Sequence, residues 1–74
     1  MEIKAYKDGT KCQIKLLKQT GIIIGFHVRR NILQTYDVAY NQNGAEVCVE
    51  MSPSELEVDK NADKVVVIGY KASE

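Results

Sequence analysis

Turn signals divide this chain at short, fairly regular intervals, and this spacing constrains the fold more than any other feature. The strongest signal is Asn43-Gly44, because both residues tolerate the positive φ angles of the tight turn that joins two antiparallel strands. Short apolar segments lie between the signals, and no stretch of any length has a helical period. This arrangement is typical of an all-β protein. The signals are Asp8-Gly9, Thr20-Gly21, Arg30-Asn31, Asn43-Gly44, Ser52-Pro53 and the polar run over residues 59–63.

Alternation of apolar and polar side chains predicts the strands and the face that each strand buries. Val38 and Val49 fall on the predicted core face, as do Leu16 and Ile24. Residues 1–6 are predicted to pair beside the last strand. The predicted strands cover residues 11–17, 21–30, 34–41, 45–51 and 64–70.

A helical turn is predicted after the fourth of these strands. Ser52 can cap the turn, and Pro53 has the backbone angle of a first helical position. Glu55 stands where a capping box closes. We expect one short turn here, which delivers Leu56 to the end of the core.

The order of these motifs is similar to that of a known fold. A Gly-x-Ile-x-Gly strand over residues 21–25 precedes a Tyr-x-Val-x-Tyr strand over residues 36–40, and the proline turn ends in Leu56-Glu57. This order, over about residues 8–70, resembles the small SH3-like barrels, which include Tudor-like and KOW-like modules. The resemblance implies one all-β domain over residues 1–74, a barrel of about five strands with one short helical turn before the last strand. It implies no activity, because this fold carries many unrelated functions.

One enzyme family resembles this architecture: the plasmid-encoded, trimethoprim-resistant dihydrofolate reductases, which build one active site from four subunits. Their Val-Gln-Ile-Tyr motif before the proline turn is absent here, where residues 47–51 read Val-Cys-Val-Glu-Met. The resemblance therefore implies no catalytic residue. We expect a protein that is not an enzyme and has no cofactor, with an oligomeric enzyme whose site lies on a shared axis as an alternative.

The charges balance, with 10 basic and 10 acidic residues, whereas dedicated nucleic-acid binders usually carry a basic excess. The two signs are nevertheless unevenly distributed, since basic residues dominate the first 40 positions and acidic residues the remainder. An alternative function is therefore nucleic-acid binding. Its candidate residues are Lys15, Lys18, Arg29 and Arg30.

The cysteines and the apolar stretches indicate in which cellular compartment the protein is expected. Residues 22–24 form an apolar stretch that is far too short to cross a bilayer, and no signal peptide is recognised. Cys12 and Cys48 fit a reducing compartment, so a cytoplasmic protein with no membrane partner is expected. Strand alternation points Cys12 inward and Cys48 outward, and with His27 they are too few and too widely spaced for a zinc site. No metal site is predicted.

His27 is the sole histidine, and Asp37 lies on the adjacent predicted strand with compatible facing. A contact between these two side chains is therefore expected. We interpret it as a cross-strand pair on the surface rather than as catalytic machinery.

The main functional hypothesis is a non-enzymatic binding module that contacts a protein partner or forms a homo-oligomer. It depends on a modest apolar patch predicted on the outer sheet face, because such patches often mark contact surfaces. The predicted interface residues are Ile23, Gly25, Ala39 and Cys48.

Overall fold

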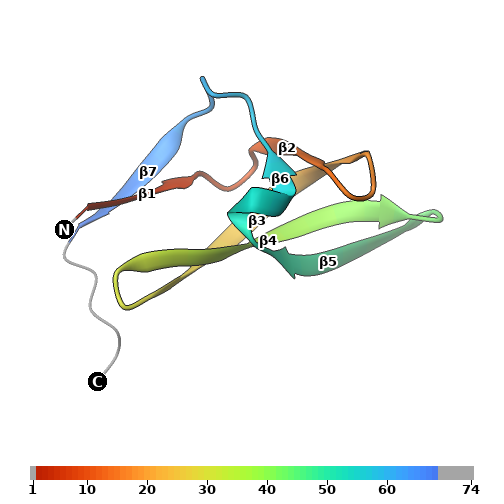
Figure 1. The fold of residues 1–74 in the computed structure, drawn as a ribbon. Helices are drawn as coiled ribbons and strands as arrows, with labels where there is room; N and C mark the ends of the chain where they lie inside the picture. Colours follow the sequence, from red (N-terminus) through yellow and green to blue (C-terminus); the bar gives the residue numbers. More distant parts are fainter. Residues whose placement is uncertain (1, 69–74) are drawn as a thin grey trace.

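A computed structural model gives the structure over residues 2–68, with side chains described for residues 3–66. The chain forms seven strands and one short 3-10 turn, η1 (Figure 1). In the described part of the chain, no helix is long and apolar enough to cross a membrane. The elements are β1 (Glu2–Tyr6), β2 (Lys11–Ile14), β3 (Gln19–Arg29), β4 (Ile32–Gln42), β5 (Ala45–Met51), η1 (Pro53–Glu55), β6 (Leu56–Glu57) and β7 (Lys64–Ile68).

These strands form two antiparallel sheets. One has five strands in the order β5-β4-β3-β2-β6, and the other pairs β1 with β7. The predicted pairing of the N-terminal segment with the last strand is therefore confirmed, although Met1 and the predicted end at Tyr70 lie outside the described residues. The all-β class and the helical turn are confirmed as well. The SH3-like barrel stays a prediction, because the strand pairs of residues 2–68 form two sheets and no ladder joins them into one.

The two long hairpins close through the turns that the sequence predicts. Asn43 and Gly44 have φ angles of 52° and 86°, and Arg30 and Asn31 have 55° and 62°. Two consecutive positive φ angles define the type I′ turn, whose twist matches that of the flanking strands. The Gly44 N–H also donates a hydrogen bond to Asn41 Oδ1 at 2.9 Å.

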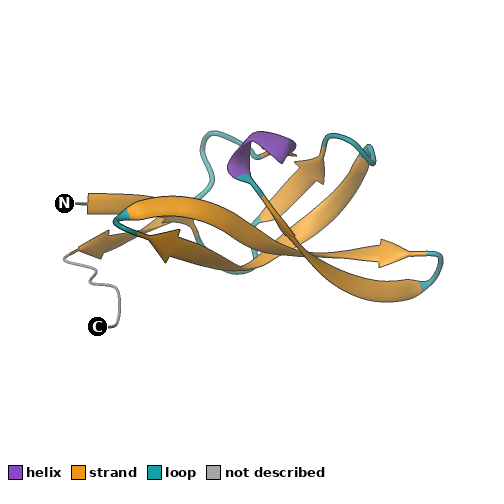
Figure 2. Cartoon of the chain, turned by 60° about the horizontal axis from the view of Figure 1, so that its bottom comes forward, coloured by secondary structure: helices purple, strands orange, loops and turns teal. Residues whose placement is uncertain are grey.

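The turn η1 carries the chain from β5 across to β6, as the purple segment in Figure 2 shows. The Ser52 N–H donates to Glu55 Oε1 and the Glu55 N–H donates to the Ser52 carbonyl, both at 2.9 Å. The Lys15 N–H donates to the Glu55 carbonyl at 3.1 Å, which ties η1 to the end of β2. Leu56 then enters the core with 7% of its surface exposed, as expected.

A single buried cluster lies between β1 and the inner face of the five-stranded sheet. Tyr36 connects the two sheets, because its hydroxyl accepts a hydrogen bond from the Tyr6 N–H at 3.0 Å and its ring lies 5.9 Å from the Tyr6 ring. Burial raises the pKa of the Tyr36 hydroxyl. The cluster contains Ala5, Cys12, Ile14, Ile23, Tyr36, Val38 and Leu56.

The predicted facing of β3 is wrong at its centre. Ile23 is 0% exposed and Ile24 is 45% exposed, the reverse of the prediction. Ile23 lies opposite Val38 and Gly25 lies opposite Asp37, so Ile24 is an extra residue with no partner on β4. Such a β-bulge shifts the alternation of inward and outward side chains by one residue. The prediction extended the alternation of the residues after the bulge to the residues before it, where it does not hold.

The predicted burial of Leu16 is also wrong, since 88% of its surface is exposed. The strand ends at Ile14, and the Lys18 N–H turns back to donate to the Ile14 carbonyl at 2.7 Å. Leu16 therefore lies in the turn between β2 and β3 rather than in a strand. The predicted burial of Val38 is confirmed at 0% exposure, whereas Val49 is half-buried.

Candidate functional site

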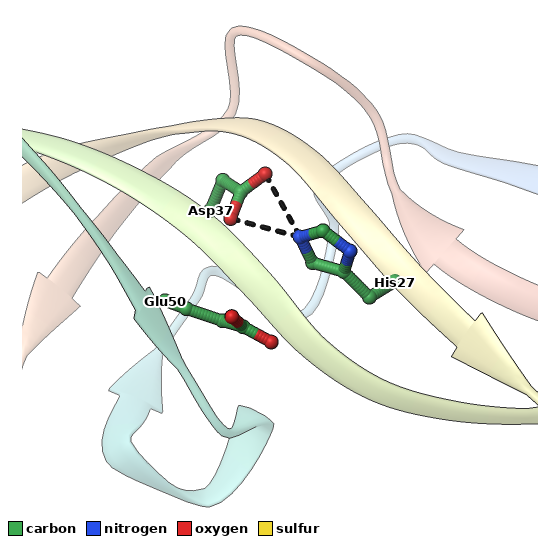
Figure 3. A group of neighbouring side chains, drawn as sticks. All are labelled: His27, Asp37 and Glu50. Carbon is green, nitrogen blue, oxygen red and sulfur yellow. Dashed lines mark hydrogen bonds and ion pairs between the residues drawn. The ribbon is translucent and has the colours of Figure 1, made fainter.

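Three chemically active side chains meet on the outer face of the five-stranded sheet. His27, Asp37 and Glu50 come from β3, β4 and β5, one from each of three neighbouring strands (Figure 3). Asp37 is the central residue, because it lies directly opposite Gly25 on β3 and Glu50 on β5. The bulge at Ile24 sets this register, so the cluster depends on it.

The expected contact between His27 and Asp37 is confirmed. His27 Nε2 lies 3.0 Å from both carboxylate oxygens of Asp37. Glu50 completes the group, and one ligand atom from each of the three residues lies within 4.8 Å of the others. The Thr35 hydroxyl donates to Glu50 Oε2 at 2.5 Å and orients that carboxylate.

Gly25 has no side chain and therefore leaves room for the Asp37 carboxylate on the neighbouring strand. A Cβ at this position would stand 3.3 Å from Asp37 Oδ2, closer than an ordinary van der Waals contact. Any larger residue would therefore crowd the carboxylate against which His27 rests.

The electrostatics of the cluster favour positive charge. The hydrogen bond to Asp37 raises the pKa of His27, and the charges of Asp37 and Glu50 act in the same direction. The three side chains are exposed or half-exposed. The group can hold a proton on the imidazole, or it can direct one nitrogen and two carboxylates toward a cation.

The predicted interface patch is wrong at Ile23, which is buried inside the sheet. Ala39 faces outward but is only 6% exposed, while Gly25 is half-buried and Cys48 is exposed. Ile22 instead lies opposite Ala39 on the outer face. The structure therefore keeps an apolar row across β3, β4 and β5, but it is narrower than expected.

The four basic residues of the nucleic-acid alternative are not brought together. Lys15 and Lys18 lie in the turn before β3, and Arg29 and Arg30 lie at its other end. The first ten residues of β3, residues 19–28, lie between the two pairs, which corresponds to roughly 33 Å along an extended strand. No single basic patch results from these residues.

The cysteines face as predicted, because Cys12 is buried and Cys48 is exposed. Burial raises the pKa of the Cys12 thiol. Since Cys12 belongs to the core cluster while His27 is exposed on the outer face, these residues do not form a common ligand set.

An apolar groove at one end of the inner sheet face was not predicted. It has a volume of about 300 Å³ and lies between the β2–β3 turn and the end of β5. Leu16 and Leu17 border it with 88% and 44% of their surfaces exposed. Two adjacent leucines break the alternation expected of a strand, and this signal could have identified the turn. The groove is lined by Ile14, Leu16, Leu17, Tyr40, Val49, Glu50, Met51 and Glu55.

Among the described residues, β5 is an edge strand of the five-stranded sheet, with no strand paired on the side away from β4, and it lies beside this groove. Its seven residues pair with β4 without a register shift, from Ala45 opposite Gln42 to Met51 opposite Tyr36. Edge strands are usually protected from further pairing by charged side chains, lysine above all, or by proline or a bulge. Strand β5 contains no lysine or proline, and its ladder has no bulge.

Comparison with protein-family models, with curated proteins and with solved structures finds no match for this chain. The outer-face cluster and the groove beside β5 are therefore the basis for proposing a function.

Proposed function

We propose that this protein is a non-enzymatic binding module that captures an extended segment of a partner protein along β5. One observation carries the proposal: an edge strand of seven residues, without lysine, proline or a bulge, lies directly beside an exposed apolar groove. In strand addition, backbone hydrogen bonds along an edge supply affinity and side-chain pockets supply specificity. Strand β5 and the groove offer both.

The inner side of β5 sets the first requirement on the partner. Val49 and Met51 are half-buried and line the groove together with Leu16. Alternate side chains of an added strand point to this same side. Apolar side chains at those positions of the partner bury the exposed surface of Leu16, which favours binding.

The outer side of β5 sets the second requirement. Glu46 and Glu50 are both exposed there, on either side of Cys48. Opposite charges on directly paired strands attract and like charges repel. The favoured partner is therefore an extended segment that alternates apolar residues with lysine or arginine.

Charge also disfavours pairing of β5 with a second copy of itself. An antiparallel pair centred on Cys48, which uses the whole strand, places Glu46 of each copy opposite Glu50 of the other. Four carboxylates then face one another in two like-charged pairs, which destabilises such a pair. A partner of different sequence fits the edge better.

The test is an NMR titration of the ¹⁵N-labelled domain with two synthetic heptapeptides, one alternating lysine with valine and one alternating glutamate with valine. We expect the lysine peptide to shift the amides of β5 and of Leu16 and Leu17, and the glutamate peptide to leave them unchanged. Leu16→Ser should weaken binding at least about tenfold, because burial of one leucine contributes roughly 1.5–3 kcal/mol.

The matched control is Ile32→Ser, since Ile32 is 60% exposed but lies at the start of β4, next to the β3–β4 turn. This variant should bind the lysine peptide as the unmodified domain does. Shifts confined to other strands, or equal losses in the Leu16 and Ile32 variants, would show that β5 and its groove are not the binding surface.

A further inference from the structure

The outer-face cluster places two carboxylates side by side without a lysine or arginine partner among the described residues. Asp37 and Glu50 are direct cross-strand neighbours, an arrangement in which like charges destabilise a sheet. Within the described part of the chain, the ion pairs join Lys7 to Asp63 and His27 to Asp37, so no lysine or arginine lies within 4.0 Å of either carboxylate. Protonation of the exposed His27 imidazole offsets only one of the two charges. A bound divalent cation would balance both.

The spacing of His27 and Asp37 matches that of two metal ligands. Two ligands that each lie about 2.1 Å from a zinc ion stand roughly 3.0–3.4 Å apart when they subtend 90–109° at the metal. The distance from His27 Nε2 to each Asp37 oxygen is 3.0 Å, and the Glu50 oxygen lies within 4.8 Å of both residues' ligand atoms. For all three atoms to bind one ion, the Glu50 carboxylate must come within this spacing of the other two ligand atoms.

The surroundings hold the ligands in place, as the neighbours of metal ligands commonly do. Thr35 donates to one oxygen of Glu50 and leaves the other oxygen free of that bond. Gly25 keeps clear the space beside Asp37 Oδ2. The ligands come from three paired strands rather than from loops, which limits their movement.

We infer that His27, Asp37 and Glu50 bind a divalent first-row transition-metal ion of the Zn²⁺ class, with water in the remaining positions. One imidazole and two carboxylates suit such ions, whereas Mg²⁺ and Ca²⁺ favour oxygen ligands alone. The inference shares Glu50 with the partner segment proposed above, but neither site needs the other to be occupied. Peptide binding and metal binding are measured separately, so either can fail without the other.

The experiment uses the domain with Cys48→Ser throughout, so that the exposed thiol two residues from Glu50 cannot bind the metal. Zn²⁺ is titrated by calorimetry, and Co²⁺ is added in parallel to report coordination by visible absorption. We expect saturable binding of one ion per chain. His27→Ala and Asp37→Asn should each reduce the affinity at least about tenfold, a loss that even residues behind the ligands can cause.

Glu46→Gln is the matched control, because it removes one exposed carboxylate from the same strand without touching the cluster. This variant should bind Zn²⁺ as the parent does. Circular dichroism of every variant should be unchanged, because the three ligands are exposed or half-exposed.

Proton competition supplies a second readout. The groups that face His27 are Asp37 on β4 and Glu50 on β5, and both favour its protonated form. Since the metal requires neutral imidazole, affinity should fall about tenfold for each pH unit below the His27 pKa and be nearly constant above it. Equal affinity in the parent and the His27→Ala variant, or the absence of binding at millimolar Zn²⁺, would overturn the inference.

Discussion

The two ends of the inner sheet face differ in what covers them. Near Tyr36, the strand β1 packs against the sheet, and Ala5, Ile23 and Val38 are 0% exposed. Near Tyr40, no described strand covers the sheet, and Leu16 is 88% exposed beside the groove. Both ends are apolar, so composition does not distinguish a core from a binding surface. Coverage by β1 makes the difference, because it removes apolar surface from water at one end only.

The largest expected effect comes from truncating one apolar residue at each end. Ile23→Ala should lower the free energy of unfolding by about 2–4 kcal/mol, because it leaves a cavity in the covered core. Leu16→Ala should change it by less than about 0.5 kcal/mol, as is usual for surface positions. Urea denaturation followed by circular dichroism measures both values.

The control for the first prediction is Ile24→Ala, on the bulge next to Ile23. It should cost much less than Ile23→Ala, because Ile24 is 45% exposed. Losses of similar size in the two isoleucine variants would contradict the facing of β3 described above.

A smaller effect on stability is expected where β1 attaches to the five-stranded sheet. Tyr36→Phe removes the acceptor of the Tyr6 N–H and should cost about 1 kcal/mol, the typical net contribution of such a hydrogen bond. Faster hydrogen exchange at the Tyr6 amide would show that β1 has loosened. Tyr40→Phe, at the uncovered end, should change neither quantity, since the described residues offer its hydroxyl no hydrogen bond.

The smallest effect is expected on the outer face, where His27 is exposed. The His27 pKa should lie above its ordinary value of 6.5, and Asp37→Asn should lower it, because Asp37 is the main cause of the shift. A raised pKa in the folded state means that the pair stabilises the fold fully below pH 6.5. This contribution is lost as the pH rises through the folded pKa. An NMR titration of the imidazole protons measures both pKa values, and an unchanged pKa in the Asp37→Asn variant would contradict this assignment.

Local backbone chemistry made several features predictable from the sequence. The turn at Asn43-Gly44 and the turn that begins at Pro53 follow from the φ preferences of those residues. The all-β class follows from the spacing of such turns. The contact between His27 and Asp37 was also predicted, because their facing was read correctly beyond the bulge.

Only the tertiary structure decided which isoleucine of β3 enters the core and which end of the inner face is covered. The bulge at Ile24 depends on the register of β3 with β4. The burial near Tyr36 depends on β1, and the sequence pattern does not show where β1 lies relative to β4. Glu50 joins His27 and Asp37 for the same reason, since three strands must pair before their side chains meet. Turns are set by the residues within them, whereas register and coverage are set by contacts between residues distant in the chain. The sequence alone therefore determined the elements and their order, and long-range packing determined the surfaces on which both proposals depend.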